Sequence, residues 1–338
     1  MNESLLQVSD LTITVPEGGY GEARRAVVTG VNLKVGAGEA LGLVGESGSG
    51  KSMTARAVMR LFAPGVAATG YVEFDGVDVF AMSDEALRHM RAHRVAMIFQ
   101  DPRAHINPVR TVGAFLIEGL CASGVSVADA ERRVLSLLAE VGISDGTRRM
   151  AQLPHELSGG LLQRVMIASA VSMDPDLLLA DEPTTALDVT TQSEVMAILA
   201  ELRAERGLAM LFITHDLELA AATCDVTVVM YAGAIVEQQL SPKLLTQPHH
   251  PYSSGLMVSR PDLDVVQQRL PVIEGQPIAA FEAGSGCAFA PRCTYVLPIC
   301  RDHVPALSSF GGGSVACHRA ADLVGVLPTT TTIGGSHD

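Results

Sequence analysis

The chain has 338 residues, more than the roughly 250 to 300 at which a single core stops growing, so we expect one large core and an appendage. Its formal net charge of −13 and aromatic content of 4% argue against nucleic acid as a main partner, because such binding needs clustered cations and stacking rings. The net charge alone does not exclude a local patch of basic residues. The hydrophobic content of 48%, with abundant Gly and Ala, fits an α/β protein.

The apolar pattern carries no export or membrane-spanning signal. Residues 1–6 have neither a basic region nor a long apolar stretch, so we expect no secretory signal and a chain that stays in the cytosol. The most apolar windows, 208–214 and 226–236, are shorter than the roughly 20 apolar residues that a spanning helix needs. Any membrane role is therefore predicted to be peripheral.

The first 80 residues contain three segments with a β pattern. Residues 5–15 and 27–35 alternate apolar and polar residues like half-buried strands. Residues 70–79 add another such segment, with a turn at Asp75 and Gly76. Together they predict an antiparallel β layer.

A glycine-rich stretch lies between a buried-strand pattern, 40–44, and a helical pattern, 52–61. It fits G-x-x-x-x-G-K-[ST], in which backbone N–H groups cradle phosphates at a helix N-terminus. Lys51 is predicted to contact the β and γ phosphates, and Ser52 to bind Mg²⁺ through its hydroxyl. A chance glycine-rich turn is the alternative. The predicted nucleotide-binding residues are Gly45, Glu46, Ser47, Gly48, Ser49, Gly50, Lys51, Ser52 and Met53.

The middle of the chain is predicted to be a mostly helical insert, over about residues 104–157. Apolar residues recur there at helical spacing from 111 to 142, with charged residues between them. Where the insert ends, the chain reads Leu157, Ser158, Gly159 and Gly160. Taken alone, this Ser-Gly-Gly string fits the start of a helix.

Two acidic residues follow a buried-strand pattern at 177–180. A second such run, 210–213, comes after a helical stretch, 192–206, and this order predicts parallel βα units. Asp181 and Glu182 therefore fall at the carboxyl edge of the sheet, where ligands of open α/β folds bind. Asp181 is predicted to bind Mg²⁺, and Glu182 to orient or deprotonate the attacking water. A solvated pair at a strand end is the alternative.

Two further polar residues follow strand-like runs. Gln100 comes after 95–99, so its amide could reach Mg²⁺ or the attacking water. His215 follows 210–214 and could donate to the γ-phosphate or hold the water beside Glu182. Taken alone, each also fits a structural role.

After residue 247 the amino-acid composition changes: the sequence becomes rich in proline, shows little helical pattern and contains four cysteines. Clustered thiols in a cytosolic chain indicate a metal, whereas a disulfide framework suits an oxidising compartment. Five, six and sixteen residues separate the four, and these gaps match neither the short pairs of structural zinc sites nor ferredoxin spacing. Two other cysteines, Cys121 and Cys224, are predicted to be buried hydrophobes. The clustered cysteines are Cys287, Cys293, Cys300 and Cys317.

With these motifs in order, the chain resembles the ATP-binding cassette ATPases over about residues 5 to 240. That family carries a Walker A loop, a Q-loop Gln, an LSGG signature, a Walker B strand, a D-loop and a switch His. The resemblance implies an α/β P-loop cassette with a mixed or parallel sheet, an antiparallel β subdomain and a helical insert. The corresponding residues are, in that order, 45–52, Gln100, 157–160, 177–182, 186–188 and His215.

The resemblance also implies a second cassette. Cassettes of this family dimerise head to tail, so Ser158, Gly159 and Gly160 would act on ATP held by the partner, with Asp188 at the same interface. Glycine-rich N–H groups at a helix start suit that role, because they meet a phosphate with a favourable helix dipole. Cassettes also place an aromatic residue near the N-terminus to stack on adenine, and Tyr20 is the candidate here.

Local strings narrow the resemblance to importer ATPases of the oligopeptide, dipeptide and nickel group. These strings are Gln100-Asp101-Pro102 with Asn107-Pro108, Ser158-Gly159-Gly160 followed by Gln163-Arg164, and His250-Pro251-Tyr252. The segment 286–293 resembles the C-terminal extension of peptide-importer ATPases, which implies a [4Fe-4S] cluster on the four cysteines. Zinc is the alternative, with His303 or His318 replacing a ligand.

The sequence thus predicts an ATPase subunit that powers peptide import from the cytoplasmic face of the membrane. Its predicted partners are a second cassette, a paralogue rather than a copy of itself, two permease subunits and an extracytoplasmic binding protein. The alternatives are a nickel or other small-solute importer, a soluble ATPase acting on nucleic acid or ribosomes, and a regulatory subunit without turnover. The predicted domains are a cassette at 1–255, a Cys-rich domain at 256–325 and a disordered tail at 326–338.

Overall fold

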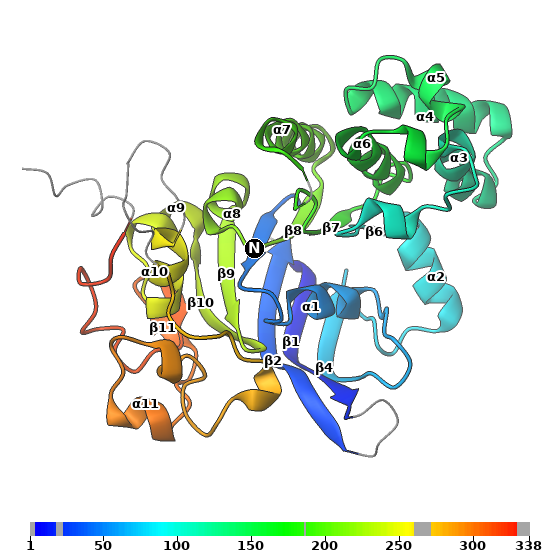
Figure 1. The fold of residues 1–338 in the computed structure, drawn as a ribbon. Helices are drawn as coiled ribbons and strands as arrows, with labels where there is room; N and C mark the ends of the chain where they lie inside the picture. Colours follow the sequence, from blue (N-terminus) through cyan, green and yellow to red (C-terminus); the bar gives the residue numbers. More distant parts are fainter. Residues whose placement is uncertain (1–3, 18–22, 186, 260–271, 330–338) are drawn as a thin grey trace, which may run out of the picture. The chain divides into compact units, whose positions relative to one another are not determined.

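The computed structural model describes residues 4–17, 23–185, 187–259 and 272–329. Within these ranges, every helix is too short or too polar to cross a membrane. Packing divides the chain into two compact units (Figure 1). Of the residues that the structure describes, the first unit holds those within 36–39 and 81–211, and the second holds those within 4–35, 40–80 and 212–329.

The first unit combines a pair of parallel strands with a group of helices. Strand β6 (Val95–Ile98) pairs in parallel with β7 (Leu177–Asp181), in the register Val95 to Leu177. The unit's helices are α2 (Asp84–His93), α3 (Val112–Ala122), α4 (Val127–Glu140), α5 (Gly146–Met150), α6 (Gly159–Ala170) and α7 (Val189–Arg206), with short 3-10 turns at Pro102–His105 and Pro154–Glu156.

The helices of this unit start where the sequence offers caps. Thr111, Ser126, Ser158 and Asp188 each accept a hydrogen bond from a backbone N–H of the following turn. Helices α3 to α7 gather into one group in Figure 1. They share an apolar core in which Leu116, Leu138, Leu162, Leu178 and Leu199 are all buried.

The second unit contains the predicted antiparallel layer. The strand order is β2 (Arg24–Gly36), β1 (Ser4–Pro16), β4 (Ala67–Phe74) and β5 (Val77–Asp78). Strands β1 and β4 are antiparallel, as are β4 and β5. The turn between β4 and β5 is the predicted one, with Asp75 and Gly76 at φ of 50° and 77°.

A mixed sheet forms the rest of the second unit. Strand β3 (Ala40–Val44) runs parallel to β9 (Val226–Tyr231), and β9 runs antiparallel to β10 (Ala234–Leu240). Strand β8 (Ala209–Thr214) begins in the first unit and ends in the second. The helices are α1 (Lys51–Val58), α8 (Leu217–Thr223), α9 (Ser241–Thr246), α10 (Pro251–Val258) and α11 (Pro298–Asp302), with 3-10 turns at Ala280–Glu282 and Ala290–Arg292.

The C-terminal segment contributes two strands to this mixed sheet. Strand β12 (Gly313–Val315) pairs antiparallel with β10, and β11 (Ser308–Phe310) pairs with β12. Helix α10 lies in a stretch for which the sequence predicted little helix, and residue 255 falls inside it. The domain division at 255 stays a prediction, and so does the tail, of which only 326–329 are described.

Three aromatic rings join strand β9 to the C-terminal segment. The ring centroids of Tyr231 and Tyr252 are 4.8 Å apart, and each of these rings lies 5.3 Å from that of Phe289. Such tilted and edge contacts add to the free energy gained by burial. The segment that carries the cysteines is therefore anchored on the same β9 that pairs with β3.

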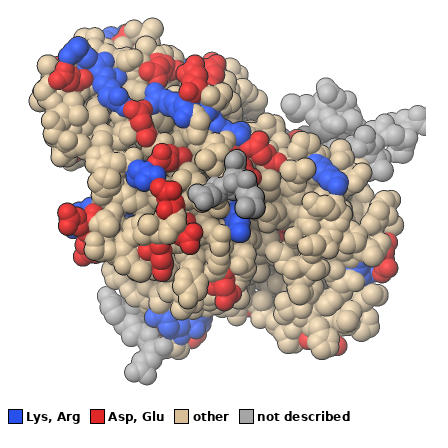
Figure 2. Space-filling model, turned by 180° about the vertical axis from the view of Figure 1, so that it is seen from behind, with Lys and Arg blue, Asp and Glu red and all other residues tan. Residues whose placement is uncertain are grey.

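Charged side chains of both signs lie near one another on the face shown in Figure 2. In the first unit, Arg206 forms ion pairs with Glu140 and Asp174, and Arg164 forms one with Glu194. Each exposed pair adds little to stability, because water and salt screen it.

Candidate active site

The predicted phosphate loop connects the buried strand β3 to helix α1. A Cβ on Gly45 would lie 2.2 Å from the carbonyl oxygen of Met230, so only glycine fits there. Gly50 caps α1 at a φ of 101°, a conformation that favours glycine. The glycines of the motif are thus required by the close approach of neighbouring backbone and by the left-handed turn.

Lys51 is buried at the start of α1, with 4% of its surface exposed. Its Nζ donates to the carbonyl oxygens of Gly45 at 2.7 Å and Glu46 at 3.0 Å. It also lies 3.4 Å from Oγ of Ser49. The ammonium group is therefore held inside the loop, where phosphate oxygens are its expected ligands. Ser52 and Met53 follow it, half-buried, in the first turn of α1.

His215 lies beside the phosphate loop. It is exposed, directly after β8 and before Asp216, which caps α8. His215 lines a pocket of about 640 Å³ together with Glu46 and Ser47 of the loop. The second unit thus brings together the phosphate loop and a histidine that lies far from it in the sequence.

The first unit brings together Gln100 and Glu182. Nε2 of Gln100 donates to Oε2 of Glu182 at 3.0 Å, and Oγ1 of Thr185 donates to the same oxygen at 2.8 Å. Asp181 ends β7 and is 2% exposed. Glu182 has a φ of 47°, a left-handed conformation that costs a non-glycine residue about 1 to 3 kcal/mol. Such strain is typical of functional positions.

The signature residues start helix α6. Ser158 is the exposed cap, and its Oγ accepts from the N–H of Leu161 at 3.4 Å. Gly159 is exposed, whereas a Cβ on Gly160 would lie 2.4 Å from Cγ2 of Thr191 in α7. Ser158 and Gly159 are thus open to solvent, and Gly160 lies where α6 and α7 approach closely.

Asp188 caps helix α7 through Thr191. Its carboxylate accepts from the backbone N of Thr191 at 3.0 Å and from Oγ1 of Thr191 at 2.7 Å. The backbone N–H of Thr191 lowers the pKa of Asp188 below its usual value, with the Thr191 hydroxyl as the next cause. Asp188 is therefore a charged residue at the start of α7, bonded to the Thr191 that Gly160 of α6 approaches.

The chain matches two family models and long stretches of known proteins. Residues 28–185 match the model described as ABC transporter, and residues 236–300 match the oligopeptide/dipeptide transporter C-terminal region. A probable peptide ABC transporter ATP-binding protein, y4tR of Sinorhizobium fredii, is 44% identical over 95% of this chain and 96% of its own length. The oligopeptide transport ATP-binding protein OppD of Salmonella typhimurium is 41% identical over 94% of both chains.

The chain belongs to the ABC transporter ATP-binding family. It is therefore an ATPase whose ATP hydrolysis is coupled to transport. A solved structure of the ATP-binding cassette MJ0796, a dimer in a post-hydrolysis state bound to ADP and Pi, matches with a TM-score of 0.62 and 27% identity. That match covers 70% of this chain and 98% of the other. It confirms the predicted α/β cassette fold.

The four clustered cysteines of this ABC ATPase line one small pocket, of about 20 Å³, together with His318. None of the four is in a disulfide. Burial is the first cause that raises the pKa of Cys287, Cys293 and Cys317, the last to about 11, and the neighbouring thiols add to it. Burial thus favours the neutral form of these three thiols, and neighbouring cysteines are close enough to reinforce that effect.

The donor set around this pocket fits a thiolate-bound metal group, because four thiols and no carboxylate line it. Among the described residues, however, no three His, Cys, Asp or Glu side chains form a group that could hold a metal ion. The pocket also has room for little more than one water molecule. A cluster on these thiols would therefore require them to move apart.

Two residues of the predicted site, Tyr20 and Ala186, lie outside the residues that the structure describes. Cys224 is buried as predicted, and Cys121 is half-buried against the apolar core of the first unit.

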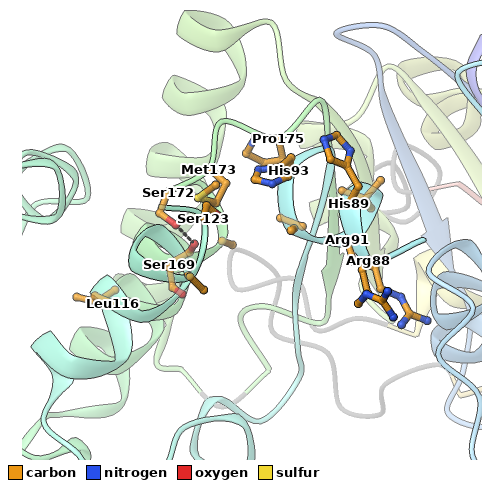
Figure 3. A pocket seen from close by; sticks show the side chains of 16 residues that line it. Arg88, His89, Arg91, His93, Leu116, Ser123, Ser169, Ser172, Met173 and Pro175 are labelled. Atoms are coloured by element: carbon orange, nitrogen blue, oxygen red, sulfur yellow. Dashed lines mark hydrogen bonds between the residues drawn. The ribbon is translucent and has the colours of Figure 1, made fainter. Parts of the chain in front are cut away.

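A separate pocket of about 530 Å³ lies in the first unit and contains none of the predicted residues (Figure 3). His89 and His93 lie together on α2 with ring centroids 4.8 Å apart, and Arg88 and Arg91 lie on a neighbouring part of the same helix. Leu116 of α3 lines it from the helical insert. The described lining contains arginine and histidine but no acidic residue.

Sequence reasoning missed three residues that contact the motifs. Thr185 bonds Glu182, as described above. Tyr252 and Arg292 contact Glu46 of the phosphate loop from the C-terminal segment. Tyr252 and Arg292 belong to the strings that resemble peptide importers, which was the available signal, but sequence pattern alone does not show which long-range partner they meet.

Proposed function

We propose that this ABC ATPase powers the import of dipeptides or oligopeptides. The observation that carries the proposal is the match of residues 236–300 to the C-terminal region of oligopeptide/dipeptide transporters. It is supported by relatives that span almost the whole chain and are named for peptide transport. Import of nickel or another small solute is the second candidate, because the strings that point to this group are shared with nickel importers.

The proposed site divides its work among several residues. Lys51 and the N–H groups of the phosphate loop bind the β and γ phosphates of ATP. Ser52, Asp181 and Gln100 are the proposed oxygen ligands of Mg²⁺, which offsets the negative charge that develops on the phosphates. Glu182 takes the proton of the attacking water, and the 3.0 Å bond from Gln100 orients its carboxylate.

His215 is the proposed contact to the γ-phosphate. Its place on the pocket lined by Glu46 and Ser47 supports that role, because those residues belong to the phosphate loop. Imidazole can donate a hydrogen bond at neutral pH, and this adds to electrostatic stabilisation of the transferring group. Tyr20 remains the proposed adenine contact.

Hydrolysis is proposed to require a second cassette. Ser158 and Gly159 are exposed at the start of α6, where N–H groups and the helix dipole favour an anion. These groups would meet ATP held by the partner cassette, and Asp188 would lie at the same interface. The partner is proposed to be a paralogue rather than a copy of this chain.

The remaining partners are two permease subunits and, through them, an extracytoplasmic binding protein. The chain is proposed to work at the cytoplasmic face of the membrane as a peripheral subunit. The helical insert, 104–157, is the proposed contact to the permease, and residues 101–107 lie between it and Gln100. An arrangement of this kind would couple the ATP site to the permease.

Transport assays with defined cargo test the peptide proposal. The transporter would be reconstituted in vesicles with its binding protein, and ATP hydrolysis measured with dipeptides, longer peptides or a nickel chelate. Stimulation by peptides and not by nickel is the expected result. Stimulation by the nickel chelate alone would show that the cargo is nickel rather than a peptide. Co-purification with ribosomes or DNA in place of permease subunits would overturn the transport role.

A [4Fe-4S] cluster on Cys287, Cys293, Cys300 and Cys317 is the proposed metal group, with zinc as the alternative. Its support is the convergence of four unpaired thiols on one pocket. Such ligation would tie together a segment with a small core. Iron, sulfide and zinc would be quantified after anaerobic purification. About four iron and four sulfide per chain is the expected result, and zinc without sulfide would exclude the cluster.

A further inference from the structure

The C-terminal segment contacts the phosphate loop through one arginine. Nη1 of Arg292 donates to Oε2 of Glu46 at 2.6 Å, and Nη2 donates to Oε1 at 3.1 Å. Both bonds join a guanidinium fork to a carboxylate, which is the strongest geometry for such a pair. Glu46 is the second residue of the phosphate loop, so the pair links positions 246 residues apart.

Arg292 is buried and contacts several other groups besides Glu46. Its side chain is 4% exposed, and Nε donates to the carbonyl oxygen of Glu274 at 3.0 Å. Nη2 also donates to the carbonyl oxygen of Ile273 at 3.3 Å. The guanidinium carbon lies 5.8 Å from the ring centroid of Tyr231 and 5.9 Å from that of Phe289. A buried cation with this many fixed partners is rigid and costly to misplace.

Glu46 is held at its backbone as well. Its N–H donates to Oη of Tyr252 in α10 at 2.8 Å, and its carbonyl oxygen accepts from Nζ of Lys51 at 3.0 Å. The C-terminal segment therefore fixes both the side chain and the amide of the residue whose carbonyl receives the phosphate-binding lysine. Movement of Glu46 would move the oxygen that holds Lys51.

We propose that Arg292 is a positioning residue for the nucleotide site, acting through Glu46 to hold the phosphate loop in the conformation that receives ATP. Arg292 directly precedes Cys293 and follows Cys287 by five positions. The folded state of the thiol pocket is thereby tied to the phosphate loop. The inference rests on the nucleotide-binding role proposed above for residues 45–53.

Nucleotide binding to the full chain tests this inference. The dissociation constant of a fluorescent ATP analogue would be measured for the wild type, Arg292→Gln, Glu46→Gln and the double variant. We expect Arg292→Gln to raise the constant about tenfold, which corresponds to about 1.4 kcal/mol. The double variant should bind no more weakly than Glu46→Gln alone, because both changes remove one interaction.

Three further variants separate positioning from general damage. Arg292→Lys keeps the charge but not the fork, and should bind with an intermediate constant. Arg301→Gln changes an exposed arginine of the same segment and should bind like the wild type. If Arg292→Gln fails to fold by circular dichroism, Glu46→Gln removes the same pair from the other side and should show the tenfold loss by itself.

Two results would overturn the inference. One is wild-type binding by folded Arg292→Gln or by Glu46→Gln. The other is a double variant whose loss is the product of the two single losses, since that would mean that the residues act separately. Lys51→Ala tests the underlying site. If Lys51→Ala binds the analogue as tightly as the wild type, the nucleotide-binding role of the loop is wrong. If Lys51→Ala binds weakly while Arg292→Gln binds like the wild type, only the positioning role of Arg292 is rejected.

Discussion

Nε2 of Gln100 donates a hydrogen bond to Oε2 of Glu182 at 3.0 Å, which joins the second residue beyond β6 to the residue directly after β7. Strands β6 and β7 are parallel neighbours, so their carboxyl ends bring the two side chains to the same edge. Two motifs that the sequence shows separately are thus one hydrogen-bonded unit. The bond fixes one carboxylate oxygen of the residue proposed to accept the proton.

Glu182→Gln should abolish ATP hydrolysis while ATP binding persists. The amide keeps the size of the side chain but cannot take a proton from water, so the rate constant should fall by roughly 100-fold or more. Hydrolysis would be measured in the reconstituted transporter, and binding with a fluorescent ATP analogue. Glu201→Gln, an exposed residue of α7, serves as the control and should hydrolyse ATP at the wild-type rate. Wild-type turnover by Glu182→Gln would contradict its role.

Gln100→Ala should slow hydrolysis by roughly 10- to 100-fold, because a hydrogen bond to a charged group contributes about 1.5 to 3 kcal/mol. The variant leaves the bond from Thr185 to the same oxygen. Thr185→Ala is therefore the matched comparison, and the two changes together should cost more than either alone. An unchanged maximal rate in Gln100→Ala would show that this bond does not orient the carboxylate during turnover.

The central motifs and their order could be predicted because each uses a local pattern. An apolar strand, a glycine loop and a helix follow one another at residues 40–58, and Asp181 and Glu182 directly follow their strand. The contacts of Arg292 with Glu46 could not, because 246 residues separate them and no periodicity encodes the pair. Strands β11 and β12 have three residues each, too few to show an alternating pattern.

Helix α10 escaped the sequence analysis for a different reason. It is buried at five of its eight positions, so it lacks the polar face that makes a surface helix recognisable. Its Ser-Ser-Gly string also has low helix propensity, and Pro251 occupies a first-turn position where proline is tolerated. Packing against the rest of the second unit, rather than local preference, stabilises this helix.

Gly45→Ala should destabilise the chain far more than Gly48→Ala. A Cβ at position 45 would lie 2.2 Å from the carbonyl oxygen of Met230, whereas a Cβ at position 48 has open space. Gly48 has a φ of 83°, so alanine there costs only about 1 to 2 kcal/mol of backbone strain. Urea unfolding of both variants would measure the difference. Equal losses would show that the backbone around Gly45 relaxes freely.

Gly159→Asp should separate ATP binding from hydrolysis. The structure has room for the side chain, since the nearest atom to a Cβ there is Cδ2 of Leu187 at 3.8 Å, and aspartate suits a helix N-terminus. Its charge would repel the γ-phosphate held by a partner cassette. We expect normal ATP binding by the isolated chain and at least about 100-fold slower hydrolysis in the assembled transporter. Weakened binding in the isolated chain would instead place the signature at the chain's own nucleotide.

Glu237 is the buried acidic group whose removal should be most costly to the second unit. It is 0% exposed in β10, and its oxygens accept from the backbone N–H of His249 at 2.6 Å, from that of His250 at 2.9 Å and from Nε2 of Gln239 at 2.7 Å. Glu237→Ala would leave two buried N–H groups without this acceptor, so we expect a loss of roughly 3 kcal/mol in the free energy of unfolding. Glu131→Ala, at an exposed position, should change it by less than about 0.5 kcal/mol.

Stability should also depend on pH through Glu237. Burial raises the pKa of its carboxyl above the usual value of 4.5, although the hydrogen bonds oppose the shift, and Nδ1 of His249 lies 3.8 Å from Oε1. The folded chain therefore keeps the proton to a higher pH than the unfolded chain. Its stabilising contribution is complete below 4.5 and is lost as pH rises through the folded pKa, by up to about 1.4 kcal/mol per pH unit. Glu237→Gln has no proton to lose, so urea unfolding at a series of pH values should show the wild type losing stability relative to this variant as pH rises from 4.5. A constant difference between the two proteins would mean that the buried carboxyl titrates alike in both states.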